Sequence, residues 1–252
     1  MSRPAPAFRS VAALTAHDLR LTARRGENVL VTIVIPIAVL LFFASTGIIP
    51  GIGGRPVDFL LPGSIGLAII ATGLVNLGIA TAYERSYGVL KRLGGAPLPR
   101  WALVVSRIGA VLVLEVVQVV ALVAVAALVL GWAPGAGWSP VLLLVAILLG
   151  TTAFASLGLL LAGTLRAEAT LALANGLFLG FLMLGGIVLP VDHLPDLLRP
   201  IAAVLPATAL ADLLRISLAS GAASPTAGGP LTILAAWAIA ATALAVRTFR
   251  WD

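Results

Sequence analysis

Few side chains in this sequence have the type and spacing that catalysis or metal binding would need. The two histidines, His17 and His193, are far apart, cysteine is absent and no H-E-x-x-H motif occurs, so we expect no metal site. The one lysine, Lys91, is not part of a G-x-x-x-x-G-K-[ST] phosphate loop. Without a serine–histidine–acid signature either, the chain is not expected to be an enzyme, nor to bind or hydrolyse ATP by itself.

Polar residues also interrupt apolar stretches. Glu115 and Gln118 share a helix face by their i, i+3 spacing, and Arg107 lies two turns earlier on roughly the same face. An ionisable group in lipid is costly, so Glu115 should face protein or a water-filled path. It either contacts a transported substrate or pairs with another helix, and we favour the pair. Asn76 and Asn175 are further candidates for a translocation path or for hydrogen bonds between helices.

The elements that position these residues follow from composition. Hydrophobic residues make up 60% of the 252 residues and charged residues 10%, with a mean hydropathy of +1.12. A soluble domain has roughly 45–50% apolar and about 25% charged residues. The apolar runs are continuous and close to the roughly 20 residues of a transmembrane helix, without the alternation of a barrel strand. The sequence therefore predicts an all-α integral membrane protein.

We expect a single transmembrane domain over residues 1–252 with six spans. Three segments are not spans. Residues 8–25 form an amphipathic helix expected at the membrane interface. The loop 84–100 lies between two spans, and Pro190–Gly229 is interrupted by prolines and should form short helices in the outer leaflet. The expected spans are Val29–Ile49, Phe59–Tyr83, Ala102–Leu130, Val141–Leu165, Ala169–Leu189 and Leu231–Val246.

The basic residues predict the orientation. With both termini in the cytoplasm, only Arg55, Arg199 and Arg215 of the 16 basic residues fall outside, as the positive-inside rule requires. The net charge of +6 sits in short segments between spans, so we expect no nucleic-acid partner. No cleavable signal peptide is expected before the first span.

The loop after the second span carries a pattern of its own. Tyr83, Tyr87 and Leu90 have the i, i+4, i+7 spacing of one helical face. Gly94-Gly95 should end this helix, and the prolines that follow prevent its resumption. The loop is either a solvated basic segment that sets topology or a short amphipathic helix offered to a cytoplasmic partner.

The sequence contains two composite motifs. The first is an acidic-basic pair, a glycine, L-K-R-L and a proline, and the second is a G-x-x-x-P…L-P…L-P-x-T…L-R pattern between the last two spans. The first is carried by Glu84, Arg85, Gly88, Leu90, Lys91, Arg92 and Pro97, and the second by Gly186, Pro190, Pro195, Pro206, Thr208 and Arg215. Together they resemble the type-2 ABC exporter permease family, in which the first motif forms the coupling helix.

The resemblance implies a permease that pairs with a second copy or homologue and docks a separate cytoplasmic ABC ATPase, on which ATP and Mg²⁺ bind. The first motif would couple to that ATPase and the second would line the outer exit. The composition, rich in alanine, leucine, valine and arginine with one lysine, favours the lipid of a bacterial inner (plasma) membrane. An apolar bundle with few charges inside the membrane suits a drug-like or lipid-like amphiphile as cargo, as in multidrug efflux and antibiotic resistance. The alternatives are a stand-alone secondary transporter or channel, for which Glu115 is the evident proton-coupling group, and a membrane enzyme that acts on lipid.

Overall fold

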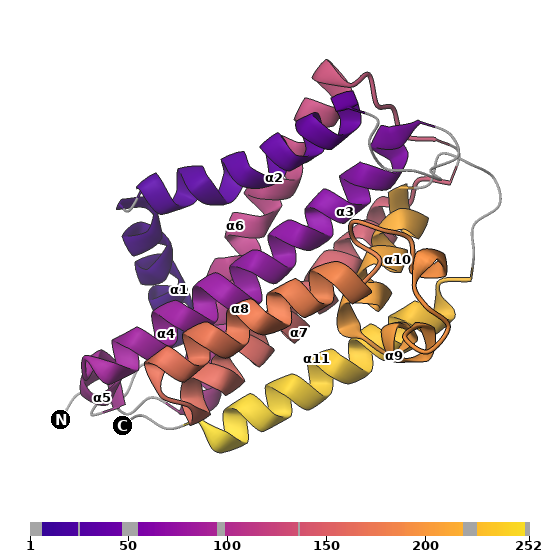
Figure 1. Ribbon diagram of the computed structural model, residues 1–252. Coiled ribbons are helices and arrows are strands. Elements are labelled where there is room, and N and C mark those ends of the chain that lie inside the picture. Colours follow the sequence, from indigo (N-terminus) through magenta and orange to yellow (C-terminus); the bar gives the residue numbers. More distant parts are fainter. Residues whose placement is uncertain are drawn as a thin grey trace.

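The structure, a computed structural model, describes residues 7–24, 26–46, 55–94, 99–135, 137–218 and 226–249. Within these ranges the regular elements are all helices (Figure 1). They are α1 (Ala7–Arg24), α2 (Gly26–Thr46), α3 (Pro56–Ile70), the π-helix η1 (Ala71–Asn76), α4 (Leu77–Ser86), α5 (Val89–Gly94), α6 (Arg100–Val129), α7 (Pro140–Thr164), α8 (Ala167–Leu184), the 3₁₀ helix η2 (Val191–His193), α9 (Arg199–Ala203), α10 (Pro206–Leu218) and α11 (Gly228–Thr248).

Five helical stretches in the described part of the chain are long and apolar enough to cross a membrane. They correspond to the second to sixth predicted spans, so the chain is a multi-pass membrane protein. The first predicted span overlaps the 21-residue helix α2, of which the stretch Thr32–Thr46 is apolar, and a sixth span stays a prediction. The five stretches are Pro56–Ser86, Arg100–Val129, Pro140–Thr164, Ala167–Leu184 and Gly228–Thr248.

The fifth predicted span is wrong at its C-terminal end. The sequence predicts a helix as far as Leu189, but α8 ends at Leu184 and Gly185 caps it. Gly186 has a φ of 67°, in the left-handed region that terminates helices. The chain then turns away from the α8 axis before Pro190, because neither the left-handed glycine nor a proline can continue the helix.

Helix α7 forms the centre of the bundle and contacts α4, α6, α10, α11 and η1. The core around it is aliphatic, and the Phe154 and Phe181 rings meet edge to face with centroids 5.5 Å apart. At one point η1 and α7 touch through backbone alone. A Cβ on Gly158 would lie 2.6 Å from the Gly73 carbonyl oxygen, so this crossing depends on glycine, as small residues allow in membrane bundles.

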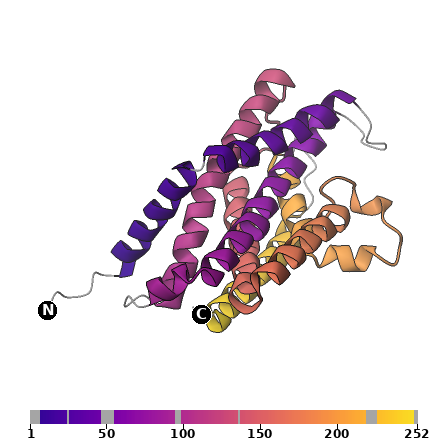
Figure 2. The same cartoon turned by 60° about the vertical axis from the view of Figure 1, so that its left-hand side comes forward.

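The two ends of the bundle differ. At one end, called the α5 end, lie α1, α5, the start of α6 and the end of α11 (Figure 1). At the opposite end, called the α10 end, lie η2, α9 and α10. The indigo helix α1 and the orange segment around α9 lie on opposite sides of the molecule in both views (Figure 2).

Helix α1 agrees closely with the predicted amphipathic helix of residues 8–25. It packs on α6 and also contacts α2. The side chain of Phe8 is 81% exposed, whereas Thr15 and Asp18, one turn apart, turn toward α6. Placement of this helix at the membrane interface stays a prediction.

We expect Gly158→Ala to destabilise the protein by about 1–3 kcal/mol, because the added methyl group pushes η1 away from α7. The matched control is Gly180→Ala on α8, where no atom lies within 4 Å of the added Cβ and alanine favours the helix. Thermal unfolding in detergent, followed by tryptophan fluorescence, measures both. Equal midpoints for the two variants would contradict the backbone contact.

Candidate functional site

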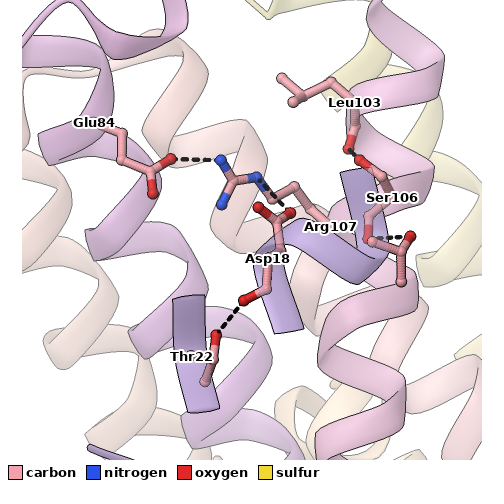
Figure 3. A network of polar contacts seen from close by, with 7 residues as sticks. Asp18, Thr22, Glu84, Leu103, Ser106 and Arg107 are labelled. Atoms are coloured by element: carbon pink, nitrogen blue, oxygen red, sulfur yellow. Dashed lines mark hydrogen bonds and ion pairs between the residues drawn. The ribbon is translucent and has the colours of Figure 1, made fainter. Parts of the chain in front are cut away.

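An arginine joins three helices at the α5 end. Arg107 of α6 lies between Asp18 of α1 and Glu84 of α4 (Figure 3). Its Nη2 donates to Glu84 Oε2 at 2.5 Å, and its Nε lies 3.4 Å from Asp18 Oδ2. We call these three residues the Arg107 network. Only 11% of the Arg107 side chain and 12% of the Asp18 side chain are exposed, so these charges are largely removed from water and depend on one another.

The local contacts of α1 explain how Asp18 reaches this place. The Thr15 hydroxyl donates to the Ser106 carbonyl oxygen at 3.2 Å. A Cβ on Gly109 would make ordinary van der Waals contact with Thr15, 3.4 Å from its Oγ1, so α1 lies directly against this part of α6. Burial raises the pKa of the Asp18 carboxyl, and the positive charge of Arg107 opposes that rise. Arg107 therefore faces α1 and α4, and not the Glu115 region of its own helix.

The described residues predicted to couple to an ATPase lie on α4, on α5 and in the turn between them. Gly88 forms the turn with a φ of 73°, which most L-residues avoid. Tyr83 and Tyr87 share a face as predicted, with ring centroids 6.1 Å apart. The turn breaks the helix after them, so the prediction that Leu90 continues this face is wrong. The Tyr87 side chain is 76% exposed, whereas Leu90 is fully buried.

Three attachments hold this segment to the bundle. Arg85 Nη2 donates to the Leu165 carbonyl oxygen at the end of α7. Glu84 belongs to the Arg107 network, and Leu90 packs in a cluster with Leu103 and Phe249. Lys91 is exposed beside them. The side chain of Arg92 and all of Pro97 lie outside the described residues.

A cavity of about 630 Å³ opens beside the Arg107 network, between α1, α2, α6 and the η1–α4 helix. We call it the Gln118 cavity. Gln118 accepts from the Thr72 hydroxyl at 3.3 Å and donates to the Thr32 carbonyl oxygen at 3.0 Å. Asn76, at the end of η1, also lines this cavity. A π-helical turn is often found at functional sites, and here it supplies both Thr72 and Asn76.

The other two path candidates lie elsewhere. Glu115 is fully buried between α6 and α7, and its Oε2 accepts from the Thr151 hydroxyl. Its Oε1 has no hydrogen-bond partner among the described residues, and Glu115 lines neither described cavity. Asn175 is exposed on α8 and donates to Leu171 of the same helix at 2.8 Å. Asn175 therefore makes no hydrogen bond to another described helix.

Three residues of the second motif, Pro190, Thr208 and Arg215, line a cavity of about 740 Å³ at the α10 end. Arg215 donates to the Gly186 carbonyl oxygen and lies 4.4 Å from the centre of the Phe59 ring. Asp212 is its ion-pair partner at 3.5 Å. Burial raises the pKa of Asp212 and lowers that of Arg215, and the pair's mutual attraction opposes both shifts.

The remaining residues of the second motif occupy different positions. Pro190 and Thr208 line the cavity at the α10 end, and the Thr208 hydroxyl is buried without a hydrogen-bond partner among the described residues. Pro206 begins α10, which is buried against α3, α7 and α11. Pro195 is exposed in the loop before α9. The predicted short helices are present within 190–218, and α10 lies inside the bundle.

The Arg107 network as a unit was not predicted from the sequence. Asp18 was visible as the one acidic residue of an arginine-containing helix. Its partners, however, come from two other helices, and no spacing rule connects them.

The sequence of the chain is similar to a known protein family. A family model described as ABC-2 type transporter matches residues 9–219, which is most of the chain. No curated protein matches the chain. In the part of the chain that the structure describes, no group of three acidic, histidine or cysteine side chains could hold a metal ion.

We expect Arg107→Gln to loosen α1 from α6, because it leaves two partly buried carboxylates without their cation. The chain has no native cysteine, so a single Thr15→Cys substitution can report the contact through its rate of maleimide labelling. The rate should rise several-fold in the Arg107→Gln background.

Two controls accompany this measurement. Ala16→Cys on the exposed face of α1 should label at the same rate in both backgrounds. Arg100→Gln removes an exposed charge and should leave the thiol introduced by Thr15→Cys protected. An unchanged labelling rate of that thiol in the Arg107→Gln background would contradict the role of the network.

Proposed function

The chain belongs to the ABC-2 type transporter family, and from this premise we propose that it is the membrane-spanning permease subunit of an ATP-driven exporter. The observation that carries the coupling role is the turn at Gly88. The turn and α5 present exposed residues while the rest of the segment is attached to the bundle. Tyr87, Val89 and Lys91 are exposed there and form the surface that we assign to a cytoplasmic ABC ATPase, which binds ATP and Mg²⁺.

Three contacts connect this surface directly to helices of the bundle. Glu84 connects α4 to α6 through Arg107, Arg85 connects it to the end of α7, and Leu90 connects α5 to α6 and the end of α11. A short segment held at several points moves as a rigid body with the helices that hold it. Arg92 and Pro97 belong to the same motif and are included in the proposal.

The two cavities suggest where a substrate passes. The Gln118 cavity lies toward the α5 end and the Thr208-lined cavity at the α10 end, with the packed core between them. We assign entry to the first, with Gln118 and Asn76 as contact residues. Exit is assigned to the second, with Gly186, Pro190, Pro195, Pro206, Thr208 and Arg215. Glu115 is assigned a structural role against Thr151, and Asn175 to a surface facing lipid or a second permease copy.

The α5 end is the cytoplasmic end in this proposal, because it carries most of the basic residues. Both termini would then be cytoplasmic, in a bacterial inner membrane. The mostly aliphatic lining of the Gln118 cavity supports a drug-like or lipid-like amphiphile as cargo, as a multidrug exporter that confers antibiotic resistance would carry. A gradient-driven transporter coupled through Glu115 has less support, because Glu115 lines neither described cavity.

Affinity purification from native membranes in mild detergent, followed by mass spectrometry, tests the proposal. A near-stoichiometric subunit with a G-x-x-x-x-G-K-[ST] loop is expected. If the chain came alone and its membranes moved solutes without ATP, the exporter assignment would be wrong.

Gly88→Val tests the turn itself. No atom lies within 4 Å of a Cβ at Gly88, so the valine acts through the backbone. A left-handed L-residue costs about 1–2 kcal/mol, or roughly 5–30-fold in the population of the turn. We expect less ATPase to co-purify and less ATP-driven transport, with normal yield and an unfolding midpoint lowered by only a few degrees. Gly88→Asn, which tolerates this conformation better, should retain more of both, and equal activity of the two variants would argue against the coupling role.

A further inference from the structure

The charges that line the Gln118 cavity are unbalanced. Among its described lining residues the charged side chains are those of Asp18, Glu84 and Arg107. Two carboxylates against one guanidinium leave one net negative charge when all three are ionised. All three lie at the same end of the cavity, because they form one network.

The rest of the cavity wall is mostly aliphatic. Leu67, Leu77 and Leu114 are typical of it, and Phe178 adds one aromatic ring. The polar groups of Gln118 are already bonded to Thr72 and Thr32. The cavity therefore has a long apolar part and a negatively charged end, which together match a molecule with an apolar body and a compact positive group.

An anionic headgroup fits this end poorly. Arg107 directs Nη2 to Glu84, and its Nε is buried beside Asp18. An incoming anion would have to displace a carboxylate and would meet both at close range. In a site with little water such like-charge contacts cost more than at an exposed surface.

We propose that the Gln118 cavity binds an amphiphilic organic cation, with its positive group at Asp18 and Glu84 and its apolar body along α6 and η1. Its role as exported cargo rests on the proposed function, but binding does not require an ATPase. Glu84 serves both sites, so a bound cation competes with Arg107 for this carboxylate and alters the attachment of the Gly88 turn.

Tetraphenylphosphonium and tetraphenylborate, hydrophobic ions of similar shape and opposite charge, test this proposal. The full chain is placed in phosphatidylcholine nanodiscs, and equilibrium dialysis measures each ion against empty discs of the same lipid. We expect saturable binding of tetraphenylphosphonium, one per chain, and no protein-dependent binding of tetraphenylborate. Protein-dependent binding of the anion with equal or higher affinity would overturn the proposal.

Three variants locate the site. Asp18→Asn and Glu84→Gln should each lower the affinity for tetraphenylphosphonium by roughly fivefold or more. Glu168→Gln removes an exposed carboxylate at the start of α8, outside the cavity, and should bind as the wild type does. If all three variants bind equally, the positive group does not lie at Asp18 and Glu84.

A fourth variant, Leu114→Trp, fills the cavity and should abolish binding of tetraphenylphosphonium without a change in the protein's elution volume in size-exclusion chromatography. If it folds poorly, the conservative Asn and Gln variants still decide whether the positive group lies at Asp18 and Glu84.

The outcomes also separate the two proposals. A chain that binds the cation through Asp18 and Glu84 but purifies without an ATPase retains this site and loses the exporter assignment. A chain that purifies with an ATPase but fails the variant test loses only the cation site.

Discussion

Arg107 imposes the strongest constraint on the α5 end of this molecule. A guanidinium that is almost removed from water needs carboxylate partners, and α6 itself supplies none in reach. Asp18 comes from α1 and Glu84 from α4, so both helices must dock on α6 before the charge is satisfied. The same contact therefore fixes the position of α1, closes one end of the Gln118 cavity and holds the segment that leads to Gly88.

Packing elsewhere in the bundle follows a different rule. Helices η1 and α7 approach at Gly73 and Gly158 until their backbones are in contact. Within lipid the hydrophobic effect does not drive helices together, so this contact depends on van der Waals packing. Helix α2 contacts chiefly α3, and the Gln118 cavity lies between it and α6. The tight glycine crossing thus anchors one wall of the cavity, while the looser helix forms another, and rearrangement of the cavity would cost least on the α2 side.

The sequence predicted what depends on local patterns. The long apolar runs predicted five spans, and most of the predicted span ends are correct to within a few residues. Glycine and proline marked the interruptions after Leu184. It failed where a single backbone conformation or a distant partner decides. The left-handed Gly88 separated Tyr87 from Leu90, although their spacing suits one helix. The pairing of Arg107 could not be found from spacing, because Asp18 and Glu84 lie on separate helices whose packing is a tertiary property. Gln118 and Asn76 were predicted as polar residues within spans, but their place in one cavity depends on the packing of η1 against α6.

The shared use of Glu84 makes the two proposed sites thermodynamically dependent. A ligand that weakens the Glu84–Arg107 pair changes the free energy of moving the Gly88 turn, and by linkage any partner that moves the turn must change the affinity of the cavity by the same factor. No longer pathway is needed, because one carboxylate takes part in both equilibria. The exposed Lys91 and Tyr87 can change their contacts without affecting this dependence. Loss of the Glu84 charge would remove it. In such an arrangement the permease would distinguish an occupied cavity from an empty one at the position where its partner docks.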